Sequence, residues 1–159
     1  MKNGIIAIWA FFIVLLVGCG SSGTSAGDLT GSEPPEATIT IGTETYETIL
    51  GTYCWKNGNK GICVDTAGPE DLLEGKDPIP VKPGEEITFV MGYEPKPNQI
   101  SVMQFSENGE TEVDVKDNRF TAPTEKGIYY YSYGVWWMDE DQENVSNGDA
   151  FYAFAIEVQ

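Results

Sequence analysis

The chain has 159 residues, a formal net charge of −16 and no histidine. This length suits one domain with a short extension, and the charge repels the phosphates of nucleic acids, so we expect no nucleic-acid partner. Without histidine the chain lacks the usual general base, the Ser–His and Cys–His nucleophile pairs and imidazole metal ligands, so we expect a protein that is not an enzyme and holds no cofactor.

The N-terminal residues have the pattern of a bacterial lipoprotein signal peptide. Lys2 precedes an apolar run over residues 5–17, which is shorter than the roughly 18 residues of a membrane-spanning helix. The run ends in Leu16-Val17-Gly18-Cys19, which matches a lipobox. We expect residues 1–18 to be removed and Cys19 to carry a diacylglycerol that anchors the protein at the outer face of the cytoplasmic membrane. The alternative is an ordinary secretory signal with a chance cysteine.

Residues 19–36 are mostly small or polar and predict a flexible, lipid-anchored linker before a domain over residues 37–159. In that domain, apolar and polar residues alternate with period two in short segments separated by turn residues. Strands are expected at residues 37–41, 52–55, 61–65, 86–91, 99–105, 111–115, 127–138 and 150–158. This pattern predicts an all-β fold, an immunoglobulin-like antiparallel β-sandwich. Only residues 69–74, with Pro69 first and Gly75 after them, predict a short helix.

Two cysteines indicate a hairpin closed by a disulfide. Cys54 and Cys63 lie symmetrically about Gly58-Asn59, and glycine suits the positive φ of a two-residue hairpin loop. With that loop the cysteines face each other in a non-hydrogen-bonded pair, the closer kind of cross-strand pair. A redox-active pair is disfavoured, because eight residues separate the cysteines, unlike a Cys-x-x-Cys motif. We expect a structural disulfide.

The strand expected at residues 127–138 has two unusual features. It opens with Gly127-Ile128-Tyr129, the setting of a tyrosine corner, in which the Tyr129 hydroxyl bonds back to a backbone group. It also carries aromatic residues on both faces: Tyr129, Tyr131, Tyr133, Val135 and Trp137 on one, and Ile128, Tyr130, Ser132 and Trp136 on the other.

Two interpretations of the second aromatic face are open. The 52–65 hairpin covers it with Tyr53 and Trp55, or it is an exposed surface for a glycan, an apolar ligand or a partner protein. In the second case the candidate binding surface consists of Trp55, Tyr130, Trp136 and Trp137.

An acidic segment follows that strand at residues 139–144, with Asp149 beyond it. Carboxylate oxygens suit Ca²⁺, and Asp139, Asp141 and Glu143 are the weak candidate ligands. The EF-hand pattern fails, however, because the glycine and the glutamate that it requires are missing. The default interpretation is a solvated loop and no metal site.

Several short motifs together resemble a known group of proteins. They are Thr52-Tyr53-Cys54-Trp55 with Cys63, Pro69–Leu73, Val81-x-Pro83-Gly84-x-x-Ile87, Pro95, and Ala122-Pro123 before Gly127-x-Tyr129-x-Tyr131. Over residues 37–158 the chain resembles the small, uncharacterised lipoproteins of Bacillus-type Gram-positive bacteria. This resemblance implies an immunoglobulin-like core on a membrane-anchored domain that faces the wall, and it supplies no activity or catalytic residue.

The sequence therefore predicts a lipid-anchored, extracytoplasmic lipoprotein that acts as a non-catalytic binding module. Its expected contacts are the membrane, through the lipid on Cys19, and an envelope protein or a wall glycan. The alternative is a cation- or ligand-sensing accessory subunit of a cell-envelope complex, which would use the acidic segment. A third class, a hydrolase that uses carboxylates alone, is disfavoured because no acidic residue stands isolated in an apolar strand.

Overall fold

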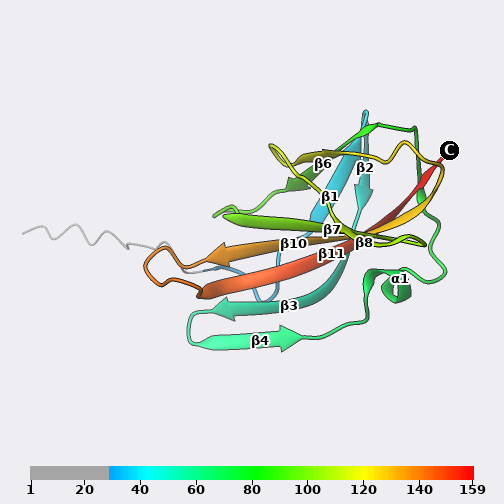
Figure 1. Ribbon diagram of the computed structural model, residues 1–159. Helices are drawn as coiled ribbons and strands as arrows, with labels where there is room; N and C mark the ends of the chain where they lie inside the picture. Colours follow the sequence, from blue (N-terminus) through cyan, green and yellow to red (C-terminus); the bar gives the residue numbers. More distant parts are fainter. Residues whose placement is uncertain (1–28) are drawn as a thin grey trace, which may run out of the picture.

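The computed structural model describes residues 29–159, which form eleven strands and one short helix (Figure 1). The strands are β1 (Ala37–Ile41), β2 (Glu44–Glu47), β3 (Ile49–Asn57), β4 (Lys60–Val64), β5 (Ile79–Val81), β6 (Glu86–Met91), β7 (Gln99–Ser106), β8 (Gly109–Glu112), β9 (Arg119–Thr121), β10 (Gly127–Met138) and β11 (Ser146–Val158), and the helix is α1 (Pro69–Leu72). In this part of the chain no helix is long and apolar enough to span a membrane.

The strands form two sheets that pack face to face. The smaller sheet has the order β2-β1-β6-β9, and the larger has the order β4-β3-β11-β10-β7-β8. All of these neighbours pair antiparallel, while the short β5 pairs parallel with β11. The predicted all-β sandwich, with a disulfide-closed hairpin and one short helix, is confirmed.

Over residues 29–159 the strand order matches that of an immunoglobulin domain, with additional strands and without strand D. β1, β6 and β9 correspond to strands A, B and E of one sheet, and β7, β10 and β11 correspond to C, F and G of the other. β8 extends the second sheet next to β7, as strand C′ does in variable-type domains. The Tyr129 hydroxyl donates to the Glu125 carbonyl at 2.9 Å, so the predicted tyrosine corner is confirmed.

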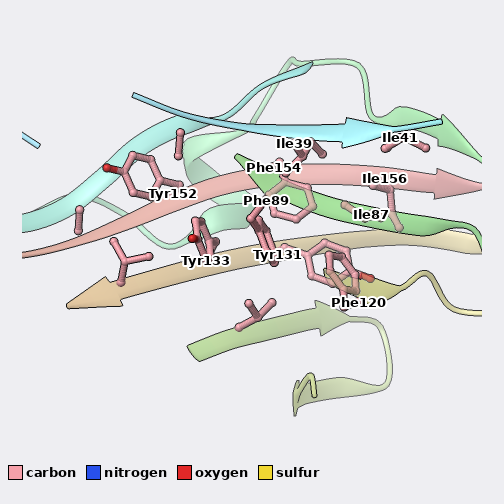
Figure 2. Packing of buried hydrophobic residues seen from close by; sticks show 14 of the residues in the cluster. Ile39, Ile41, Ile87, Phe89, Phe120, Tyr131, Tyr133, Tyr152, Phe154 and Ile156 are labelled. Atoms are coloured by element: carbon pink, nitrogen blue, oxygen red, sulfur yellow. The ribbon is translucent and has the colours of Figure 1, made fainter. Parts of the chain in front are cut away.

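An aromatic core fills the space between the sheets (Figure 2). Phe89 of the smaller sheet stacks on Tyr133 of the larger, with ring centroids 3.9 Å apart, and Tyr131 stacks on Phe154 at 4.9 Å. Burial raises the pKa of the Tyr133 phenol to about 12. The inward side chains alternate along β10 and β11, so period two in the sequence determines which residues meet here.

The folded domain begins before the predicted boundary at residue 37. Leu29 is only 3% exposed, and the Trp55 indole N–H donates to the Gly31 carbonyl at 3.2 Å. The Tyr152 hydroxyl donates to the Pro35 carbonyl. Residues 29–36 are thus part of the domain, and their assignment to a linker is wrong. Leu29 is the only large apolar residue in this segment, but its backbone carbonyls accept hydrogen bonds from polar groups of core side chains. The signal peptide (1–18), Cys19 and the rest of the predicted linker lie outside the described residues.

Some strands differ from the sequence prediction. β2, β5 and β9 are three or four residues long. β2 is mostly exposed and β5 contains Pro80, so neither has the alternating pattern of a half-buried strand. β11 starts at Ser146 rather than at residue 150, because its first residues pair with the end of β10.

Candidate functional site

The two faces of β10 have opposite environments. Tyr129, Tyr131, Tyr133, Val135 and Trp137 point into the core and are at most 8% exposed. The opposite face, with Ile128, Tyr130, Ser132 and Trp136, is partly or fully exposed. We call this side of the larger sheet the outer face.

The hairpin β3–β4 does not cover the outer face, so that expectation is wrong. β3 pairs with β11 and extends the same sheet, with Tyr53 opposite Ala150 and Trp55 opposite Gly148. Tyr53 and Trp55 therefore point into the core. Gly148 makes room for this packing: a Cβ there would lie 2.7 Å from the Trp55 ring and 2.5 Å from Leu29.

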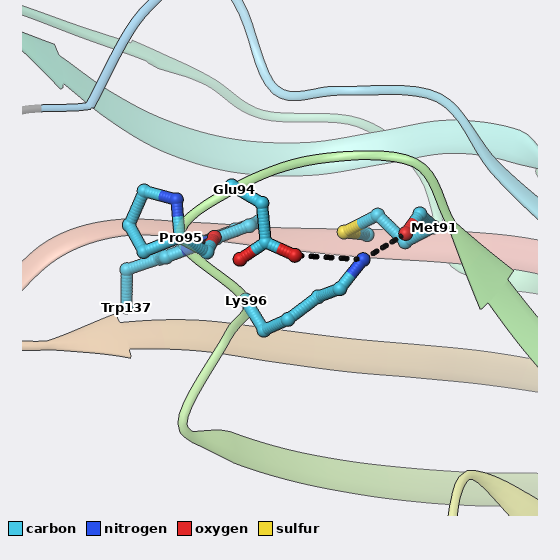
Figure 3. Close-up of polar contacts among 5 residues, drawn as sticks. All are labelled: Met91, Glu94, Pro95, Lys96 and Trp137. Carbon is cyan, nitrogen blue, oxygen red and sulfur yellow. Dashed lines mark hydrogen bonds and ion pairs between the residues drawn. The ribbon is translucent and has the colours of Figure 1, made fainter.

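Trp55 and Trp137 consequently cannot belong to an exposed binding surface, and this part of the prediction is also wrong. They are 2% and 4% exposed, and their ring centroids lie 5.0 Å apart in an edge-to-face arrangement. The Trp137 indole N–H donates to the Pro95 carbonyl at 2.7 Å. Figure 3 shows the loop that supplies this carbonyl, where Lys96 bonds to the Met91 carbonyl and lies 3.5 Å from the Glu94 carboxylate.

Trp136, in contrast, lies partly exposed on the outer face and packs against Phe151 of β11. The two rings meet edge to face with centroids 5.3 Å apart. They meet above Gly134, where a Cβ would lie 2.8 Å from the Trp136 ring and 2.9 Å from the Phe151 ring. We call these two residues the aromatic pair. Phe151 is not among the residues of the predicted binding surface, although its alternation with Ala153 and Ala155 along the last strand marks it as a large side chain on a face of small ones.

Another part of the outer face is covered by α1 and the residues after it. Leu73 packs on Ala153 and Ala155 of β11, and Tyr130 borders this small cluster. Pro69 starts α1, and acidic residues in the first turn favour its N-terminal end. Tyr130 is thus half-buried and takes part in packing α1 against the sheet.

A groove lies between the covered part and the aromatic pair. Its volume is about 290 Å³, and Phe151 lines it together with Pro69 and Leu72. The hydroxyl-bearing residues Thr52, Thr66 and Ser132 also line it. No charged residue is among its lining residues, in a chain that has 34 charged residues (25 acidic and 9 basic).

The disulfide lies on the same outer face, at the far side of β11. Cys54 and Cys63 are bonded, and the register Trp55–Ile62, Lys56–Gly61, Asn57–Lys60 agrees with the predicted hairpin. Gly58 has the expected positive φ, 58°. Asp149, between Trp136 and Cys54 in the sheet, accepts the Cys54 N–H at 3.2 Å, and desolvation raises the pKa of its carboxyl.

The acidic segment forms a loop that Asp139 organises. Its Oδ1 accepts the amide N–H groups of Asp141 and Gln142 at 2.9 and 3.0 Å, and Oδ2 lies 3.4 Å from the Asn147 side-chain nitrogen. These hydrogen bonds, that from the Asp141 amide first, lower the pKa of the Asp139 carboxyl. Asp141 and Glu143 point to solvent. Over residues 29–159, no three acidic or cysteine side chains gather as a metal site would require.

Comparison with known proteins supplies no family for the chain. No protein-family model matches it, and no curated protein sequence is significantly similar to it. The features that bear on function are therefore those of the outer face, with the aromatic pair and the groove at its centre.

Proposed function

We propose that this protein is an extracytoplasmic lipoprotein, anchored through Cys19, that acts as a non-catalytic binding module. The observation that carries the binding role is the aromatic pair, Trp136 and Phe151, which lies partly exposed beside an uncharged groove. Aromatic rings that are half in water and half packed are typical of recognition surfaces, because they bury a large area with little loss of side-chain freedom.

The arrangement of the sheet supports a permanent surface rather than an incidental one. The aromatic pair lies on β10 and β11, the central and longest strands of the larger sheet. Both strands contribute core residues on their opposite face, so the backbone below the pair is held rigidly. Gly134 is required for the rings to meet, since a Cβ there would separate them.

The anchor is proposed from the lipobox and from the resemblance to small lipoproteins of Bacillus-type bacteria. Nine residues lie between Cys19 and Leu29. A chain of this length can reach at most about 35 Å. Leu29 borders a hollow that is also lined by Glu140 of the acidic segment and by Asn147 at the start of β11. An anchored domain would therefore direct that end toward the membrane and leave the outer face accessible from the side.

The anchor is tested by fractionating cells that produce the protein or its Cys19→Ser variant. We expect the protein in the membrane fraction, accessible to protease added to cells whose wall has been removed. The variant should leave the membrane fraction. Equal membrane association of both would contradict lipidation at Cys19.

The binding role is tested by photo-crosslinking in intact cells with a photoreactive amino acid at position 136. The control is the same residue at position 128, since Ile128 is 45% exposed on the same strand and face but at its other end. Adducts that depend on position 136 are expected. The same adducts from both positions, or none from either, would contradict a binding site at the aromatic pair.

A further inference from the structure

We infer that the ligand of this outer face is a neutral glycan, one pyranose ring of which lies in the groove beside Phe151; this inference rests on the proposed binding role. The groove combines two kinds of lining. Phe151, Pro69 and Leu72 supply apolar surface, and Thr52, Thr66 and Ser132 supply hydroxyl groups. A pyranose ring has the same division, with C–H groups across its faces and hydroxyls around its rim.

The charge of the protein argues against charged polymers as ligands of this groove. The chain has a net charge of −16, so its field repels polyphosphates and other anionic polymers. Cations would be attracted to carboxylates, and none lines the groove. The lining therefore favours an uncharged ligand, which needs no ionic partner.

The distribution of exposed apolar residues favours a glycan over a protein as the ligand. A stable protein interface buries about 800 Å² on each side around an apolar centre. The exposed large apolar residues Ile62, Val90, Ile128 and Val145 lie on different strands or loops, and none of them lines the groove. A groove of about 290 Å³ instead lies at the lower end of the range for small-molecule sites.

The hydroxyl groups that line the groove favour a sugar over a purely apolar ligand. Thr66 donates its backbone N–H to the Thr52 hydroxyl at 3.1 Å, which fixes the loop over the groove. Each hydroxyl can form more than one hydrogen bond, so these groups can still pair with a ligand. The Thr66 hydroxyl donates to the Ala67 carbonyl at 3.2 Å, and the Thr52 hydroxyl lies 3.4 Å from the Asp65 carboxylate. Their remaining acceptor lone pairs can accept from sugar hydroxyls, whereas an apolar molecule in the groove would leave this capacity unused. The adjacent Trp136 extends the apolar surface and would contact the next sugar of the chain.

The test is calorimetric titration of the full-length protein, purified from membranes in a detergent without a sugar headgroup. The probes are the tetrasaccharides of N-acetylglucosamine and of β-1,4-linked glucose, both neutral. We expect saturable binding of at least one. Thr66→Val removes one hydroxyl at nearly constant volume and should weaken binding about five- to tenfold.

A second variant fills the groove without removing a contact. At Gly51 a Cβ would lie 3.2 Å from Thr66 Oγ1, 3.3 Å from the Phe151 carbonyl oxygen and 3.4 Å from Leu72 Cδ2, so Gly51→Ala should narrow the floor of the groove and weaken binding by about tenfold or more. Ile128→Ala, on the same face but away from the groove, is the control and should stay within about twofold of wild type. Unchanged circular dichroism and melting temperature show that each variant is folded.

Two results would overturn the inference, and the crosslinking experiment then decides whether the proposed function stands. Binding of neither tetrasaccharide excludes the ligand class, and binding that Gly51→Ala and Thr66→Val leave unchanged excludes the groove. If neither sugar binds but position 136 crosslinks to a protein in cells, the binding role stands and the glycan is wrong. If neither sugar binds and no crosslink forms, both proposals fail.

Discussion

The adjacent residues Trp136 and Trp137 provide the sharpest test of the fold, because they have the same chemistry and opposite environments. Trp137 is 4% exposed, packs edge to face with Trp55 and Tyr93, and bonds to the Pro95 carbonyl at 2.7 Å. Trp137→Ala removes a buried aromatic side chain, which typically costs about 3–5 kcal/mol, and leaves a carbonyl without its partner. The free energy of unfolding of an ordinary domain is about 5–15 kcal/mol, so this variant would lose much or all of its stability.

Trp136→Ala should cost far less. Its ring packs mainly on Phe151 and above Gly134, and an aromatic pair contributes about 0.5–1.5 kcal/mol beyond its buried area. We expect a loss of about 1–2 kcal/mol with unchanged far-UV circular dichroism. The assay is urea unfolding of both variants, with the midpoint and the slope compared with wild type. Equal losses, or a larger loss for Trp136→Ala, would refute the assignment of the two faces.

Three further predictions follow from the hairpin, the core and the acidic loop. Reduction of Cys54–Cys63 opens a loop of about ten residues and should lower the free energy of unfolding by roughly 2–3 kcal/mol without unfolding the protein; an unchanged melting temperature after verified reduction would contradict this. Burial raises the pKa of Tyr133 to about 12. The protonated phenol therefore contributes stability that is fully present below pH 10 and is lost as the pH rises through 12, up to about 3 kcal/mol. Burial also raises the pKa of Tyr131 and Tyr152, so alkaline urea titrations of wild type and Tyr133→Phe isolate this contribution, and equal losses of unfolding free energy in both would exclude it. Because Asp139 already accepts hydrogen bonds from its own loop, we expect millimolar Ca²⁺ to leave the melting temperature unchanged, and a Ca²⁺-dependent rise would favour the cation-sensing alternative.

Local features of the fold could be predicted from the sequence. The Cys54–Cys63 register follows from counting outward from Gly58-Asn59, and the tyrosine corner follows from a glycine and a tyrosine at the start of a strand. In both cases the interacting groups are close in the sequence. Period two also grouped the residues of β10 correctly by face.

The position of the hairpin could not be predicted, because it depends on pairing between distant strands. β3 pairs with β11, so Trp55 meets Gly148, 93 positions further along the chain. Nothing in the local sequence distinguishes a hairpin that extends a sheet from one that covers it. This pairing decides that Trp55 is in the core and that the outer face remains partly open.

The candidate site was predicted only in part for the same reason. Trp136 and Tyr130 are on the outer face as expected, but Phe151 and the groove arise from the register of β10 with β11 and from the placement of α1. The domain boundary was missed because Leu29 is a single apolar residue in a polar segment. Gly148, next to which its side chain lies, is distant in the sequence.

The most direct test of the central claim is hydroxyl-radical footprinting of the protein in intact cells and after purification. A binding surface at the aromatic pair predicts that Trp136 and Phe151 are oxidised less in cells than in the purified protein. Ile62, exposed on β4, and Ile128, exposed at the other end of β10, should be oxidised equally in both. Equal oxidation of Trp136 and Phe151 in the two preparations would show that nothing occupies this face in the cell and would contradict the account.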